Sequence, residues 1–258
     1  MARLMIGMLR LRDSVSEAVD RGRFDEPYDF VIKSLISARD AMRQLTKVWE
    51  DHERKVGDGE VAHVRGNALQ IDESVDRELG QEADAFLNAA SRVLKKGMQD
   101  VAFVLGVNIG FLFQKESAFE TGVNALQSSD PALADYLRQA RTWSETVQQA
   151  RNAVEHEGWT LPRVEYARAG DKIKAIEPEI IGKPVTEFMA FTFDRLACLV
   201  EDVTAHLLKQ KLPNLTTLAE VPLAERPAEV PERFRLTLTH GGTPAWVIAY
   251  HSSSFEHT

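Results

Sequence analysis

The stretch Tyr28–Trp49 reads "YDFVIKSLISARDAMRQLTKVW" and contains the clearest helical pattern in the chain. Its apolar residues recur at steps of three and four, which places them on one face of an α-helix. This face consists of Tyr28, Val31, Leu35, Ala38, Met42, Leu45 and Trp49. We expect Asp25 to be the N-cap of this helix and Pro27 to lie in its first turn. The pattern therefore predicts a long helix that packs one side against other helices.

Two further apolar patterns flank this segment. The pattern from Leu4 to Gly22 predicts a first amphipathic helix, and the pattern from Val75 to about Gly97 predicts a third. Between the second and third helices, three glycines and alternating polar residues predict a loop over residues 56–70. Residues 100–114, "DVAFVLGVNIGFLFQ", are so densely apolar that they fit a buried helix and a buried strand equally well.

Proline and glycine mark the ends of the last two long helices. Asp130 and Pro131 fit the N-cap and the first position of a helix that ends before Gly158. The last helix is expected to begin at Pro184 and to stop at Pro213. Together, these patterns predict a mainly α protein built as a helical bundle.

Two segments alternate in the manner of β-hairpins. "RVEYARAGDKIKAIE" (residues 163–177) is expected to turn at Ala169-Gly170-Asp171 and to form an insertion in the bundle. "RFRLTLTHGGTPAWVIAY" (residues 233–250) is expected to turn at Gly241-Gly242 and to form a C-terminal appendage.

Four prolines separate the bundle from this appendage: Pro213, Pro222, Pro227 and Pro231. The expected organisation is therefore a helical bundle domain at residues 1–212, a linker at 213–232 and a C-terminal β-hairpin segment at 233–258.

The composition limits the classes of function. The chain has 258 residues, and 39 acidic against 31 basic residues give it a net charge of −8, so any contact with nucleic acid must come from a local basic cluster. The single Cys198 excludes an internal disulfide and a cysteine-rich zinc site, and it suits a reducing cytoplasm. The N-terminal run "LMIGML" is too short for a membrane span. We expect a soluble cytoplasmic protein with no membrane association.

The end of the helix at residues 130–158 carries an unusual set of polar residues, in "QQARNAVEHEGW" (residues 148–159). The apolar stripe of this helix, followed in steps of three and four, arrives at Arg151, and burial of an unpaired guanidinium is costly. Asn152 and His156 are four residues apart and share a different face. Arg151 and His156 lie about 140° apart around an ideal helix, so their cooperation requires the long Arg151 side chain to swing round.

Two interpretations of this helix end are open. In the first, Arg151 forms an ion pair with Glu155, and His156 complements the helix dipole in a helix end capped by Gly158. In the second, the residues form a catalytic site. The spacing of Arg151 and His156 is weak support by itself, because Arg235 and His240 repeat it in a strand-like segment, and the directly following Asn152 makes the motif rarer.

The pattern R-N-x-x-x-H at the end of a bundle helix resembles the signature of the HEPN superfamily. The resemblance covers this six-residue motif and its helical setting from about Asp25 to Leu212. It implies a HEPN-like bundle that forms a homodimer with the two motifs facing one cleft. It also implies a metal-independent ribonuclease of toxin–antitoxin, abortive-infection or antiviral defence systems, with RNA as substrate, no cofactor, and an antitoxin or defence-system protein as a further partner.

The resemblance also implies roles for the motif residues. His156 would be the acid/base group at the ribose 2′-hydroxyl or the leaving 5′-oxygen, and Arg151 would stabilise charge on the scissile phosphate. Asn152 would orient His156 or the phosphate, and the product would be a 2′,3′-cyclic phosphate. Some toxins of the superfamily carry a modified Tyr two residues after the His, where this chain has Gly158, so that route of inactivation is not expected here.

Other polar residues of the sequence could also belong to a site. Arg138 and Arg141 could extend a phosphate-binding track along the same helix, with a solvated helix face as the alternative. The cluster "WEDHER" (residues 49–54) is expected to be a solvated face rather than a metal site, and His63 and His206 are expected to be structural. No metal site is expected. The sequence favours an endoribonuclease, and the alternative is a non-catalytic HEPN-like module that binds a protein partner.

Overall fold

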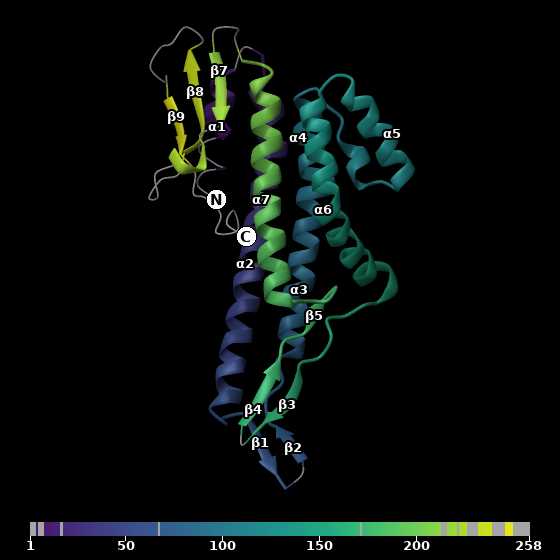
Figure 1. The fold of residues 1–258 in the computed structure, drawn as a ribbon, viewed down its shortest axis with the longest axis vertical. Helices are drawn as coiled ribbons and strands as arrows, with labels where there is room; N and C mark the ends of the chain where they lie inside the picture. The colour runs from purple at the N-terminus through teal and green to yellow at the C-terminus, as the bar shows by residue number, and fades with distance from the viewer. Residues whose placement is uncertain are drawn as a thin grey trace. The chain divides into compact units, whose positions relative to one another are not determined.

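The computed structural model describes Leu4 and residues 8–15, 18–66, 68–170, 172–212, 216–220, 222–225, 232–238 and 246–249. It is mainly helical with short antiparallel β-hairpins, as the sequence predicts (Figure 1). The α-helices are α1 (Met8–Ser14), α2 (Arg21–Gly57), α3 (Asp76–Ser91), α4 (Met98–Val104), α5 (Glu116–Gln127), α6 (Pro131–Glu157) and α7 (Val185–Lys209). None of these helices is long and apolar enough to cross a membrane.

The described strands pair only with antiparallel neighbours. Three two-stranded sheets are β1 (Ala62–Arg65) with β2 (Ala68–Ile71), β3 (Glu165–Ala169) with β4 (Lys172–Ile176), and β5 (Glu179–Ile180) with β6 (Lys183–Pro184). A three-stranded sheet has the order β7 (Thr216–Glu220), β8 (Glu232–Leu238) and β9 (Trp246–Ala249). Short helical turns are η2 (Arg92–Gly97), η3 (Gly110–Phe113) and η4 (Leu223–Glu225).

The described residues group into two compact units. The first unit comprises those within 1–35, 92–144 and 194–258, and the second comprises 36–91 and 145–193. Helices α2, α6 and α7 each contribute residues to both units. The end of α6, with the R-N-x-x-x-H motif, belongs to the second unit.

The start of α2 differs from the prediction. The helix begins at Arg21, one turn before the expected N-cap Asp25, because Asp20 accepts a hydrogen bond from the backbone of Arg23. Asp25 instead forms an ion pair with the buried Arg12 of α1. Pro27 consequently lies inside α2 rather than in its first turn. The first helix is correspondingly shorter than expected and ends at Ser14.

In the first unit, the dense apolar run at residues 100–114 is helical where it is regular. It contains the end of α4 and the turn η3, and no strand. The predicted third helix ends at Ser91 and continues as the π-helical turn η2, whose Gly97 approaches α2 closely. A Cβ at Gly97 would lie 2.4 Å from a methyl group of Val31, so this contact requires glycine. Helix α5 was not predicted.

The ends of α6 and α7 agree with the prediction. Asp130 accepts a hydrogen bond of 3.0 Å from the backbone of Leu133, which confirms it as the N-cap of α6. Gly158 follows the last residue of α6 with a φ of 66°, a conformation that favours glycine. Helix α7 begins at Val185, directly after Pro184, and ends at Lys209, before Pro213.

Two of the small sheets correct the sequence analysis. Residues 56–70 contain the end of α2 and most of the β1–β2 hairpin rather than only a loop, with Gly66 at a φ of 62° beside the turn. The predicted β3–β4 hairpin is confirmed, and Ala169 pairs with Lys172 across the turn. Strands β8 and β9 form the predicted C-terminal hairpin, but β7 lies in the expected linker and pairs with β8. Gly241-Gly242 lies outside the described residues.

Candidate functional site

The last turns of α6 place Arg151 on the inward face, as its position in the apolar stripe predicts. Val147 and Gln148, which precede it on this side of the helix, are buried, and the Arg151 side chain is 22% exposed. Its Nε atom is buried and has no hydrogen-bond partner. An unpaired buried donor is unusual in proteins and marks a position whose hydrogen bonding is incomplete.

The head of the Arg151 guanidinium is held by Glu155, one helical turn later. Arg151 Nη2 donates to Glu155 Oε1 at 2.6 Å, and Nη1 pairs with Oε2 of the same carboxylate. Two donors on two acceptors make the fork geometry in which a guanidinium binds carboxylates and phosphates. The ion pair that the sequence allows at this spacing is therefore present.

The same carboxylate also contacts His156. His156 Nε2 lies 3.3 Å from Glu155 Oε2, and the imidazole is 68% exposed. The structure therefore brings Arg151 and His156 to one anionic group, although their positions diverge around the helix axis. The ion pair of Arg151 with Glu155 has the ordinary spacing of one helical turn, and within the described residues it is Glu155, rather than a direct contact, that connects Arg151 with His156.

Asn152 is less clearly part of this group. It is exposed, and the described residues provide no hydrogen bond between its amide and His156. The helix end itself is well defined, since the backbone of Trp159, beyond Gly158, donates to the carbonyl of Ala153 at 3.1 Å. The motif thus lies on an ordinary capped helix end, with His156 in the turn where a cation complements the helix dipole.

Arg138 and Arg141, the expected phosphate track, are engaged within the first unit. Arg141 is buried, donates to the carbonyl of Leu112 at 2.5 Å and lies over the ring of Phe119 at 5.1 Å. Arg138 is half-buried and donates to Gln127 and Asp135. These contacts join α6 to η3 and α5. They favour a structural role for Arg141, which fits neither a phosphate track nor a solvated face.

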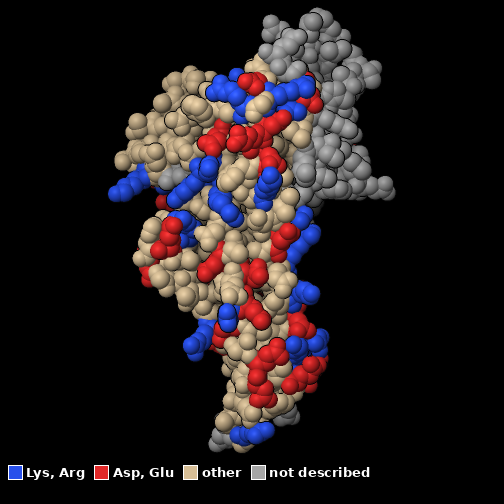
Figure 2. Space-filling model, turned by 180° about the vertical axis from the view of Figure 1, so that it is seen from behind, with Lys and Arg blue, Asp and Glu red and all other residues tan. Residues whose placement is uncertain are grey.

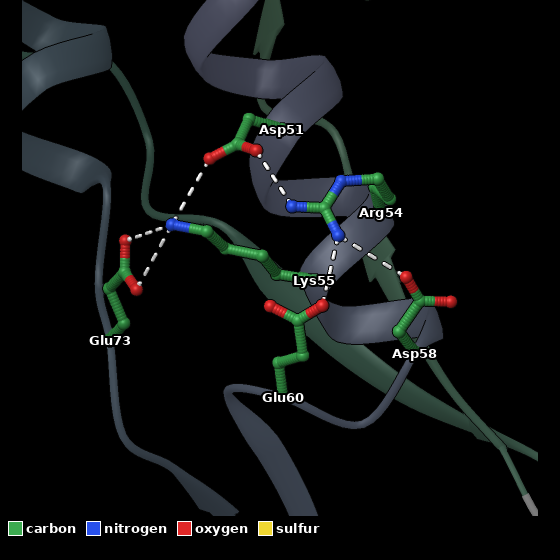
Figure 3. Close-up of polar contacts among 6 residues, drawn as sticks. All are labelled: Asp51, Arg54, Lys55, Asp58, Glu60 and Glu73. Atoms are coloured by element: carbon green, nitrogen blue, oxygen red, sulfur yellow. Dashed lines mark hydrogen bonds and ion pairs between the residues drawn. The ribbon is translucent and has the colours of Figure 1, made fainter.

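The end of α2 in the second unit holds a larger set of charges. Figure 3 shows Arg54 reaching Asp51, Asp58 and Glu60, and Lys55 lying between Asp51 and Glu73. Hydrogen bonds from Arg54 and Lys55 lower the pKa of Asp51. This network links α2 to the segments on both sides of the β1–β2 hairpin, and its members are exposed or half-buried.

The burial of His52, which is next to this network, was not predicted from the sequence. The expected solvated face is correct for Glu50, Asp51 and Glu53, but His52 is only 1% exposed. Its Nε2 lies 2.8 Å from the hydroxyl of Tyr166 in β3, and its Nδ1 is buried without a partner. Burial lowers the pKa of His52, which keeps the imidazole neutral. The spacing of Leu45, Trp49, His52 and Val56 was the available signal.

Two further histidines of the described residues, His63 and His206, each contact an aspartate, and His206 Nε2 also lies 3.2 Å from Gln210 Nε2. His63 Nε2 lies 3.1 Å from Asp72, and His206 Nε2 lies 2.7 Å from the N-cap Asp130. Within the described part of the chain, no group of three His, Cys, Asp or Glu side chains is arranged to hold a metal ion. Figure 2 shows acidic and basic side chains interspersed over the face in view, with no broad basic area among its described residues.

Comparisons of the chain with models of protein families, with curated proteins and with solved structures found no significant match.

Proposed function

We propose that the protein is a metal-independent endoribonuclease of HEPN type, with Arg151, Asn152 and His156 as its site. One observation carries this proposal: Arg151 and His156 converge on a single carboxylate, that of Glu155. In this structure, the oxygens of this carboxylate stand in for the non-bridging oxygens that an RNA phosphate would present to Arg151 and His156 during the reaction. A guanidinium fork and an imidazole on one anion form a suitable arrangement for phosphoryl transfer.

The chemistry follows from these positions. The ribose 2′-oxygen attacks phosphorus, and His156 accepts the proton of the 2′-hydroxyl or donates a proton to the leaving 5′-oxygen. Arg151 stabilises the negative charge that grows on the phosphate. The bond from phosphorus to the 5′-oxygen breaks, which leaves a 2′,3′-cyclic phosphate and a 5′-hydroxyl. A symmetric dimer would supply a second His156 to the same cleft, so that one imidazole accepts a proton while the other donates one.

The proposal extends to the biological setting of such enzymes. RNA cleavage by a dimer in the cytoplasm would serve growth control or defence, with an antitoxin or defence-system protein as regulator.

The contact between Arg151 and Glu155 also favours a second function. In this function, the protein is a non-catalytic module that binds a protein partner. Glu155 neutralises Arg151, and the chain has a net charge of −8, so the helix end offers little attraction to RNA. In this alternative, Arg151 and His156 only stabilise the end of α6.

The substitution His156→Ala separates these two functions. Positioned acid–base catalysis contributes roughly a hundred- to ten-thousandfold, so cleavage of a mixed-sequence single-stranded RNA should fall by at least about a hundredfold. Because the His156 side chain is exposed, its removal should leave the protein folded, and circular dichroism checks this. The matched control is His63→Ala, at a partly exposed histidine that contacts one aspartate.

The wild-type protein should cleave in the presence of EDTA and should not cleave a substrate with deoxyribose at the scissile position. Absence of cleavage by the wild type at micromolar concentration, or full activity in His156→Ala, would refute the ribonuclease.

A further inference from the structure

We propose that Glu155 is a built-in competitor for the anion site formed by Arg151 and His156, and that an RNA phosphate binds there by displacing it. This inference rests on the proposed function for the identity of the displacing anion. The contacts of Glu155 carry it. Its two oxygens take both terminal nitrogens of Arg151, and Oε2 also lies 3.3 Å from His156 Nε2. The donors that would hold a phosphate are therefore already occupied.

The exposure of Glu155 allows it to leave. Its side chain is 44% exposed, so the carboxylate can rotate into water without opening the core. Water screens an ion pair between partly exposed side chains, so the contribution of this one to stability is modest even in its bidentate geometry. The Arg151 side chain is more buried than that of Glu155, and its aliphatic part lies on the inward face of α6, so the guanidinium remains in place when the carboxylate moves away.

Tethering makes the competition effective despite this weakness. A carboxylate one helical turn from Arg151 is always present at the site, at an effective concentration of about millimolar or higher. A free phosphate ion at lower concentration competes poorly with it. An RNA chain, which contacts the protein at several phosphates, can supply the additional binding energy that displaces Glu155. Glu155 thus favours polyanionic substrates over small anions.

Glu157 provides a matched control on the same helix end. It is exposed, and within the described residues no ion pair joins it to Arg151 or His156. The substitutions Glu155→Gln and Glu157→Gln change the net charge equally and keep the side-chain size. A general effect of charge on RNA binding should appear in both variants, whereas release of the anion site should appear only in Glu155→Gln.

The test measures binding of a labelled 2′-O-methyl oligoribonucleotide, which resists this cleavage, by fluorescence anisotropy. Loss of the competing ion pair should tighten binding by Glu155→Gln by about three- to tenfold relative to wild type. Binding by Glu157→Gln should change by less than about twofold. In the double variant Arg151→Ala/Glu155→Gln, the gain should disappear. Inorganic phosphate should compete better with this probe in Glu155→Gln than in wild type.

The outcomes separate this inference from the ribonuclease. Equal increases in RNA affinity in Glu155→Gln and Glu157→Gln, or no increase in either, overturn the role of Glu155. This holds even when His156→Ala abolishes cleavage. A gain specific to Glu155→Gln and dependent on Arg151 supports the competitor. If wild type and Glu155→Gln then both fail to cleave RNA, the anion site is supported and the proposed ribonuclease activity is refuted.

Discussion

The ends of α2 and α6 in the second unit contain the same kinds of residue in opposite placements. At the end of α2, the histidine is buried and the arginine is exposed: His52 contacts Tyr166, and Arg54 lies among three carboxylates. At the end of α6, the arginine faces inward and His156 is exposed, and both contact Glu155. The comparison teaches that burial and partners, rather than the set of residues, distinguish the two helix ends.

Helical phase produces this difference. His52 follows Leu45 and Trp49 on the buried stripe of α2, so the neighbouring Arg54 falls on the solvent side. On α6, Arg151 occupies the corresponding inward position after Val147, and His156 falls on the solvent side. His52 is thereby enclosed against Tyr166, whereas His156 is open to solvent next to the carboxylate that holds Arg151.

The largest expected effect contrasts the two arginines. If Arg151 stabilises the phosphate charge, Arg151→Ala should lower RNA cleavage by about a hundred- to a thousandfold, the range for loss of one preorganised donor. Arg54→Ala removes an equal charge from the network of Figure 3 and should leave cleavage nearly unchanged. Rates measured under single-turnover conditions check both variants. Equal losses in the two would show that overall charge, and not a site at α6, controls activity.

The next effect concerns stability at the end of α2. Tyr166→Phe removes the 2.8 Å hydrogen bond to His52 and leaves another buried ring nitrogen without a partner, which should lower the free energy of unfolding by about 1–3 kcal/mol. The control Tyr136→Phe removes a hydrogen bond of the same length to Asp202. Because Asp202 is only half-buried, the free energy of unfolding should fall by less. Urea denaturation measures both. A larger loss in Tyr136→Phe would contradict the importance assigned to the buried pair.

The smallest effect is a pH dependence that distinguishes the two histidines. Burial lowers the pKa of His52 below its ordinary value of 6.5, so the unfolded chain binds a proton that the folded chain does not. The contribution of His52 to stability is therefore complete above pH 6.5 and is lost as the pH falls from 6.5 toward the lowered pKa. Urea unfolding at pH 7.5 and 5.5 should show this loss. His52→Leu should reduce this loss of stability, and His156→Ala should show the same loss as the wild type. An equally large loss between pH 7.5 and 5.5 in His52→Leu would exclude His52 as its cause.

The regular parts of the fold were predictable because local signals and burial agree there. The stripe from Tyr28 to Trp49 lies within α2, and Asp130 caps α6 as expected. The prediction was wrong where two residues compete to be the N-cap of one helix. Asp20 and Asp25 can each cap a helix, and the choice of Asp20 accompanies the ion pair of Asp25 with Arg12 and the stacking of Phe24 on Tyr28. Of these two contacts, the ion pair joins residues of two different helices, so the capping pattern of α2 alone does not reveal it.

For the candidate site, the sequence by itself determined that Arg151 lies on the inward face of α6 and that Gly158 ends the helix, because helical periodicity and the conformational freedom of glycine are local properties. Tertiary structure decided that Arg141 is buried over Phe119 and that His52 is covered by β3. The spacing of one helical turn already allowed the ion pair of Arg151 with Glu155, but the sequence did not show that His156 contacts the same carboxylate. The physical reason is that a long side chain has several rotamers on a helix, and only its packed surroundings select one of them.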